Sequence, residues 1–395
     1  SGTYLLLLEV MYESELPSLY QLFVTIAKDE TAKKLLEAFP QSVLCRIAVD
    51  GEEGLLCDAL YTPGMQQFFI SRMAKGQDVP FKNGELKISE SSPIKKFLAE
   101  HSDIKSRIVS EKRSHTSITY DAGFFLKIYR QVDYTINPDV ELTRFLDRQS
   151  KFKSYPEYFG GIDWILDRHT INLGMMQKLV ENHGDGRTYM QDRLSDFNEK
   201  LLALEKDRIP VVEWQDTLVK PIAYEEAPDN VKEVIGVTAG EAARLLGMRT
   251  GEMHLALEAG RGMKDFEPEN FSLHYQRSLF AGMLSLVRAA YSNQGKVLKK
   301  LPEDVRPAVE EIFSRKDAVL SRMKKMYAKK YDVTRFRIHG NYYLEQVLFT
   351  GKDVSILHFG GDPGRSFSER RIKRSPLRDV AGIIRSFHYA AHENL

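Results

Sequence analysis

The pattern of hydrophobic and polar positions in the first hundred residues predicts short strands that alternate with helices. Short apolar runs predict strands at 4–11, 42–49 and 54–60. Apolar residues at helical spacing predict helices at 16–27, 65–75 and 94–100. No motif in this segment indicates a particular chemistry.

A lysine and a glutamate stand out in the next part of the chain. The residues at 117–120 and 124–130 predict a β-hairpin, with Lys127 inside an otherwise apolar strand. The Asn-Pro pair at 137–138 predicts the start of a helix, because Asn is a favoured N-cap and Pro fits the first helical position. The apolar positions that follow make this helix amphipathic and place Glu141 on its first turns.

From about residue 185 the pattern becomes strongly helical. Amphipathic helices are predicted at 189–206, 271–291 and 307–330. The residues at 238–241 form a capping box ahead of a further helix at 242–246. Strands return only at 336–338 and 354–359. The chain is therefore predicted to be an α+β protein whose second half is mainly helical.

Composition and charge narrow the class of protein. The 395 residues suffice for two to three domains of about 150 residues each. Lys and Arg number 56 against 55 Asp and Glu, so the excess of cations that nucleic-acid binding requires is missing. The longest apolar run is far shorter than the roughly 20 residues of a membrane span. The 2 cysteines favour a reducing compartment. We therefore expect a cytoplasmic protein with neither nucleic acid nor membrane as a partner.

The order of parts is that of a protein-kinase-like fold. A buried-strand lysine is followed by a glutamate-bearing helix, a hinge, a helical region and a late loop with His-Gly at 339–340. In such a fold the lysine holds the α and β phosphates of ATP and pairs with the glutamate. Lys127 and Glu141 fit these roles. A strand lysine that reaches an exposed edge is the commoner case, so the pair alone leaves both interpretations open.

Two later loops resemble the catalytic and metal-binding loops of maltokinases. They lie at 337–348 and 356–363. Maltokinases are kinases of the aminoglycoside-phosphotransferase-like superfamily that phosphorylate maltose at its anomeric hydroxyl with ATP and magnesium. The segment 369–382 resembles the distinctive C-terminal segment of this family, and 125–145 resembles its lysine strand and glutamate helix. The resemblance extends over essentially the whole chain.

This resemblance implies a bilobal kinase-like fold in three parts. An N-terminal cap subdomain would span residues 1–104, a β-rich N-lobe with the nucleotide loop, lysine strand and hinge 105–184, and a mainly helical C-lobe with the catalytic and metal loops 185–395. The residues implied for nucleotide binding are Lys127, Glu141, Ser117, Gln177 and Val180. Those implied for sugar binding are Arg365, Arg371 and Lys373.

The chain departs from the family in both loops. Active relatives carry an aspartate that accepts the proton of the attacking hydroxyl, where this chain has Asn341. General-base catalysis contributes about 10²–10⁴-fold, and an amide cannot take the proton. The metal-binding aspartate, which acts with a glutamine such as Gln346, is replaced by His358, and imidazole is a poor ligand for magnesium. Asp362 keeps a carboxylate where the family has glutamate, and Asp353 is nearby, which leaves a displaced metal site open.

These departures predict a pseudokinase, with ATP and Mg²⁺ implied by the family and their binding here in doubt. Two alternatives stay open. One is an active maltose 1-phosphotransferase with a rearranged metal site that uses Asp362. The other is a structural or regulatory module of a trehalose synthase, to which such domains are often fused; the start at Ser1 without a methionine suits a fused origin. A zinc site at His339, His358 and Asp362 is disfavoured, because their spacing matches no known ligand pattern.

Overall fold

The computed structural model divides the chain into two compact units. It describes residues 2–13, 17–49, 51–81, 83–101, 104–112, 115–205, 209 and 223–393. Unit 1 comprises Ser1–Leu257, His339–Ile372 and Leu377–Leu395, and unit 2 comprises Glu258–Ile338 and Lys373–Pro376. The candidate catalytic loop from His339 onward and the metal loop therefore belong to the same unit as the lysine strand. The division into three parts at residues 104 and 184 stays a prediction.

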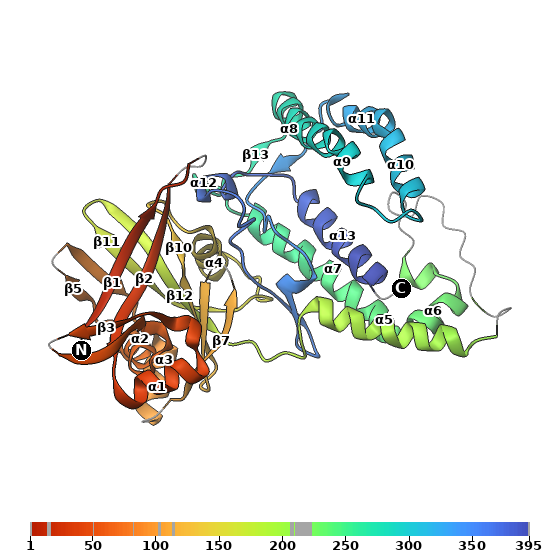
Figure 1. The fold of residues 1–395 in the computed structure, drawn as a ribbon. Coiled ribbons are helices and arrows are strands. Elements are labelled where there is room, and N and C mark those ends of the chain that lie inside the picture. Colours follow the sequence, from red (N-terminus) through yellow and green to blue (C-terminus); the bar gives the residue numbers. More distant parts are fainter. Residues whose placement is uncertain are drawn as a thin grey trace. The chain divides into compact units, whose positions relative to one another are not determined.

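The first sheet of unit 1 is antiparallel and is covered on one face by a helix. Its order is β1-β2-β4-β3, with β10 paired to β2 beside that path. The strands are β1 (Thr3–Val10), β2 (Ser18–Ala27), β3 (Val43–Val49), β4 (Glu52–Asp58) and β10 (Gln131–Val132). The helices of this region are α1 (Asp29–Ala38), α2 (Pro63–Lys75) and α3 (Ser92–Glu100) (Figure 1). Phe23 of β2 packs against Phe69 of α2 with ring centroids 5.5 Å apart, so α2 covers this face.

The helix predicted at 16–27 is wrong, because most of this segment forms strand β2. Apolar residues at 19, 22, 23 and 26 imitate a helical stripe. In the structure the same segment pairs with β1 along its length and with β4 at its end. Pairing on both sides satisfies its backbone groups and outweighs the local spacing.

The second sheet of unit 1 carries the lysine strand. Its order is β5-β6-β11-β12-β9-β8-β7. The strands are β5 (Val79–Phe81), β6 (Gly84–Ile88), β7 (Ser106–Lys112), β8 (His115–Tyr120), β9 (Phe124–Tyr129), β11 (Tyr158–Leu166) and β12 (His169–Lys178). The predicted hairpin is confirmed as β8 and β9. The predicted helix start is confirmed as α4 (Pro138–Gln149), where the Asn137 side chain accepts the N–H of Asp139.

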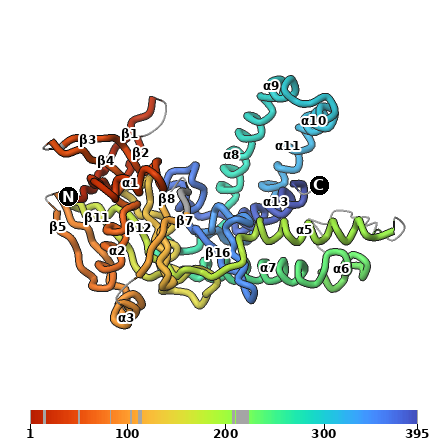
Figure 2. Tube along the Cα trace, turned by 60° about the horizontal axis from the view of Figure 1, so that its bottom comes forward, coloured from red at the N-terminus to blue at the C-terminus, as the bar shows by residue number. Residues whose placement is uncertain are grey.

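The helical part of unit 1 follows the second sheet in sequence. Its elements are α5 (Gly186–Ala203), α6 (Asp229–Ile235), α7 (Val237–Glu258), β15 (Val347–Phe349), β16 (Val354–Ile356), α12 (Phe367–Arg370) and α13 (Leu377–Glu393). Helices α5 and α7 lie side by side (Figure 2). The capping box predicted at 238–241 is wrong, because these residues lie inside α7. The boundary between α6 and α7 is instead Gly236, whose φ of 80° suits glycine.

Unit 2 is a helical insertion with one small sheet. Its elements are β13 (Glu269–Asn270), α8 (Leu273–Ser292), α9 (Gln294–Leu298), α10 (Arg306–Ser314), α11 (Lys316–Lys324) and β14 (Thr334–Arg335). The helix predicted at 307–330 is divided into α10 and α11. The strand predicted at 336–338 is also displaced: β14 ends at Arg335, and Phe336 forms a single bridge to Arg374.

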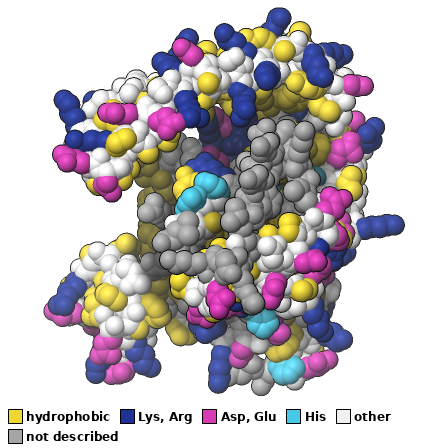
Figure 3. All heavy atoms as spheres, turned by 90° about the vertical axis from the view of Figure 1, so that its right-hand side faces the viewer, with side chains coloured by type: hydrophobic (Ala, Val, Ile, Leu, Met, Phe, Trp, Pro, Cys, Tyr) yellow, Lys and Arg dark blue, Asp and Glu magenta, His cyan; other side chains and the backbone are white. Residues whose placement is uncertain are grey.

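The face drawn in Figure 3 carries basic and acidic side chains interspersed, without a large area of one sign. Among the described residues, no helix is both long enough and apolar enough to cross a bilayer.

Candidate active site

A buried lysine and aspartate form the centre of the site. The ammonium Nζ of Lys127 donates to Oδ2 of Asp139 at 3.0 Å. The Tyr129 hydroxyl donates to the same oxygen at 3.0 Å. Positions 127 and 129 of a strand point to one side, so β9 aims both donors at the first turn of α4. Burial opposes the charged form of Asp139, but Lys127 and Tyr129 outweigh it and lower the pKa of the carboxyl.

The partner expected for Lys127 is therefore corrected from Glu141 to Asp139. Glu141 instead accepts two hydrogen bonds from Arg371, from Nε at 2.9 Å and from Nη2 at 2.6 Å. Glu141 is buried, so this two-pronged pair neutralises a carboxylate that is largely removed from water. Asp139 and Glu141, two positions apart on α4, thus pair with two different basic side chains.

A carboxylate from α13 holds the His-Gly loop in place. Asp379 is 1% exposed and accepts the backbone N–H groups of His339 and Gly340, each at 2.9 Å. His254 Nε2 lies 3.1 Å from the same carboxylate. His339 donates from Nε2 to the carbonyl of Leu357 at 2.7 Å, which ties this loop to the second one. Burial lowers the pKa of His339, and Asp379 only partly offsets this effect.

Asn341 follows this loop and lines two cavities. The first has a volume of about 360 Å³ and is lined by Asp139, Gln346, His358 and Arg370 among others. The second has a volume of about 580 Å³, with Arg378, Arg385 and Tyr389 on its wall. Asn341, Tyr343 and Glu345 line both. The position expected to hold a catalytic base is thus the place where a ligand in one cavity would meet a ligand in the other.

The residues expected to bind magnesium do not provide its preferred ligands. His358 has a φ of 58°, a left-handed conformation that side-chain-bearing residues adopt at a cost, and its ring lies 5.4 Å from that of His115. Gln346 offers one amide oxygen, Oε1, which has no hydrogen-bond partner among the described residues. In the described part of the chain, no three His, Cys, Asp or Glu side chains are placed to hold a metal ion. Besides Asp139, whose Oδ2 already accepts from Lys127 and Tyr129, this wall offers an imidazole and one amide oxygen, which is poor in the oxygen ligands that Mg²⁺ prefers.

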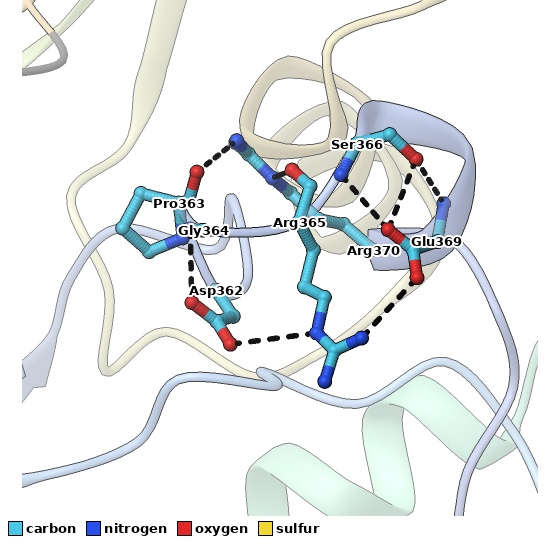
Figure 4. Close-up of polar contacts among 7 residues, drawn as sticks. All are labelled: Asp362, Pro363, Gly364, Arg365, Ser366, Glu369 and Arg370. Atoms are coloured by element: carbon cyan, nitrogen blue, oxygen red, sulfur yellow. Dashed lines mark hydrogen bonds and ion pairs between the residues drawn. The ribbon is translucent and has the colours of Figure 1, made fainter. Parts of the chain in front are cut away.

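Asp362 and Asp353 are engaged in contacts of their own. Figure 4 shows Asp362 in a tight turn, where Oδ1 accepts the N–H of Gly364 at 3.0 Å and Oδ2 lies 3.9 Å from Arg365 Nε. Arg370 closes this turn by donating to the carbonyls of Arg365 and Pro363. Asp353 accepts two hydrogen bonds of 2.8 Å from Arg249. Both carboxylates therefore already have positive or N–H partners.

The residues expected to bind nucleotide are only partly brought together. Ser117 lies opposite Lys127 in the β8–β9 ladder. Gln177 is buried and donates to the carbonyl of Pro156 at 3.2 Å. Val180 lines a separate cavity of about 790 Å³. The nucleotide-binding roles of these side chains stay predictions.

The residues expected to bind sugar are all in ion pairs. Arg365 contacts Asp362 and Glu369, and Arg371 pairs with Glu141. Lys373 belongs to unit 2, where its Nζ lies 2.9 Å from Glu269. The larger cavity beside Asn341 is lined instead by Arg187, Arg378 and Arg385, which are not among these three residues.

Sequence reasoning missed Asp139, Tyr129 and Asp379. The only signal for Asp139 was its place at the start of α4, where an acidic residue also suits the helix dipole. Tyr129 could have been found by alternation, because it follows Lys127 on the same side of β9. Nothing local marked Asp379, whose role depends on a loop some 40 residues away in the chain.

Comparisons with known proteins bear on the fold. No family model matches the chain. Among solved structures it is similar to glucosamine kinase in crystal form B, with a TM-score of 0.58 and 12% identity over 99% of this chain and 75% of that one. A complex of glucosamine kinase with glucosamine, ADP and inorganic phosphate gives a TM-score of 0.57 and 13% identity over the same shares. At such low identity the likeness shows the fold alone, and it confirms the predicted kinase-like α+β class.

Proposed function

We propose that this chain is a maltokinase-like domain that has lost phosphoryl transfer, a pseudokinase. The observation that carries the proposal is the composition of the cleft wall at Asn341 and His358. Phosphoryl transfer depends on positioning the nucleophile and on neutralising charge on the phosphates. An amide and an imidazole stand where each of these tasks would need a carboxylate.

The neighbouring carboxylates support the proposal because each of them already has a partner of its own, although Oδ1 of Asp139 has none among the described residues. Glu345 lies 2.9 Å from Arg187. Asp379 holds the loop backbone, and Asp139 holds Lys127. The alternative of an active kinase that uses Asp362 is disfavoured for the same reason, since Asp362 is committed to the turn at 362–370.

Two cavities meet at Asn341, and we infer that they accept ligands without a metal. We propose nucleotide in the smaller cavity, beside Asp139 and Arg370, and a sugar such as maltose in the larger one. Thermal denaturation with ATP, with and without magnesium, tests this directly, because a ligand that binds only the folded chain raises its Tm. The expected result is a shift that does not depend on magnesium.

A phosphotransfer assay tests the loss of activity. The chain is incubated with ATP, magnesium or manganese, and either maltose or glucosamine, and both ADP and sugar phosphate are measured. Glucosamine is included because the similar solved structure is a glucosamine kinase. The expected result is no sugar phosphate above background. Turnover within tenfold of ordinary kinase rates, roughly 1–100 s⁻¹, contradicts the proposal.

A further inference from the structure

Helix α13 carries two histidines that lie one turn apart. His388 and His392 are four positions apart, so both side chains project from the same face of the helix (Figure 1). Their Nε2 atoms lie 3.2 Å from each other, and their ring centroids are 4.5 Å apart. Both residues are exposed, and neither lines the two cavities that meet at Asn341.

The separation of the two nitrogens is that of two ligands on one metal ion. Imidazole nitrogens bind Zn²⁺ at about 2.0–2.1 Å. Two such nitrogens that subtend roughly 100–109° at the ion lie about 3.1–3.4 Å apart. The 3.2 Å between Nε2 of His388 and Nε2 of His392 falls within this interval.

The same distance also permits a hydrogen bond between the two rings. In that bond one Nε2 donates its N–H and the other Nε2 accepts it. An ion can replace the shared proton without any proton leaving the protein, because the donor ring can carry its proton on Nδ1 instead. Both Nε2 lone pairs then face the ion, and the rings need not move apart.

The last turn of α13 is anchored to α5. Arg187 and Gln191 of α5 both donate to the carboxylate of Glu393, the residue that follows His392. The two imidazoles therefore project from a helix end that is already held in place. A ligand set fixed before binding loses less conformational freedom when the ion arrives. Because both ligands belong to one helix, the chelate needs no other segment of the chain.

We propose that His388 and His392 chelate a divalent transition metal such as Zn²⁺, Ni²⁺ or Cu²⁺. Imidazole suits these ions, whereas Mg²⁺ and Ca²⁺ prefer oxygen ligands. Water completes the coordination, since no group of three His, Cys, Asp or Glu side chains is placed around an ion in the described part of the chain. The site is separate from the cleft, and the bound ion links two successive turns of α13.

Metal titration of the full chain, without an added histidine tag, tests the site. Calorimetry with Ni²⁺ at pH 7.5 is expected to show a strongest site of one ion per chain, with no such site for Mg²⁺. His388→Gln and His392→Gln should each weaken Ni²⁺ binding by about tenfold or more, because one imidazole alone forms no chelate. His169→Gln is the matched control, since it removes a different exposed histidine. Absence of the strongest site in the wild type, or unchanged affinity in either α13 variant, overturns the proposal.

Hydrogen exchange locates the bound ion independently of its affinity. With saturating Zn²⁺, the backbone amides of the last two turns of α13 are expected to exchange about threefold or more slowly, because the ion binds only the helical arrangement. The double variant His388→Gln/His392→Gln should show no such slowing. Slowing confined to other elements, or equal slowing in the double variant, places the ion elsewhere and overturns the proposal.

Discussion

The two walls of the cleft differ in how they use charge. On the wall formed by β9 and α4, Lys127 and Glu141 are buried and each is matched by an opposite charge. On the wall formed by the loops, the backbone is held by Asp379, but the positions facing the cavity carry an amide at Asn341 and an imidazole at His358. The comparison teaches that two walls of one cavity can be held differently: buried ion pairs fix the first, whereas the second is fixed through its backbone and presents an amide and an imidazole.

The largest effect is expected from breaking the buried pair. Asp139→Ala leaves the buried Lys127 ammonium without its charged partner, and we expect a loss of about 3–5 kcal/mol in the free energy of unfolding. Glu90→Ala is the matched control, because Glu90 pairs at 2.7 Å with Lys95 while both are exposed. Such a surface pair contributes about 0–1 kcal/mol. Urea denaturation measures both, and similar losses would contradict the account.

A smaller loss of stability is expected when the Arg371–Glu141 pair keeps both charges but cannot form both of its hydrogen bonds. Arg371→Lys retains a cation beside Glu141 but cannot make the two parallel hydrogen bonds. We expect a loss of about 1–2 kcal/mol in the free energy of unfolding, since one charge-assisted hydrogen bond is removed. Arg315→Lys, on the exposed pair with Glu311, should have almost no effect. Equal stability of Arg371→Lys and wild type would show that the second hydrogen bond of this pair contributes nothing to the free energy of unfolding.

The loop wall has its own test, which depends on local rather than global stability. Asp379→Asn removes the charge that holds the N–H groups of His339 and Gly340. We expect the exchange of these two amides with deuterium to accelerate about tenfold or more. Asp362→Asn is the control, because its carboxylate holds the N–H of Gly364 outside this loop. Unchanged protection in Asp379→Asn would mean that other contacts hold the loop.

The smallest expected effect is a pH dependence from His339. Burial lowers the pKa of this histidine below its usual 6.5, so just below that pH the unfolded chain binds more protons than the folded chain. The stability that the neutral imidazole contributes is therefore complete above pH 6.5 and decreases as the pH falls toward the folded-state pKa. His339→Gln should show a shallower fall in Tm between about pH 7.5 and 5.5. Parallel curves for the two proteins would contradict this origin.

The sequence predicted local features better than long-range ones. The start of α4 was predictable because Asn137 and Pro138 act within one helical turn. The partner of Lys127 was not, because Asp139 and Glu141 both lie on that turn and only the direction of β9 decides between them. The strand β2 was mistaken for a helix, since pairing with β1 and β4 is invisible in its own spacing. Residues 373–376 return to unit 2, and this was not predictable either, because it depends on contacts that are distant in the sequence.

The most direct test of the central claim compares the wild type with the variant Asn341→Asp/His358→Asp in the ATP and maltose assay. If the absence of carboxylates at positions 341 and 358 is what prevents phosphoryl transfer, the wild type forms no sugar phosphate above background. The double variant, with Asp379 and the Lys127 pair intact, then forms sugar phosphate at a rate at least about 10²-fold above that background. Turnover of the wild type within tenfold of roughly 1–100 s⁻¹ would contradict the account.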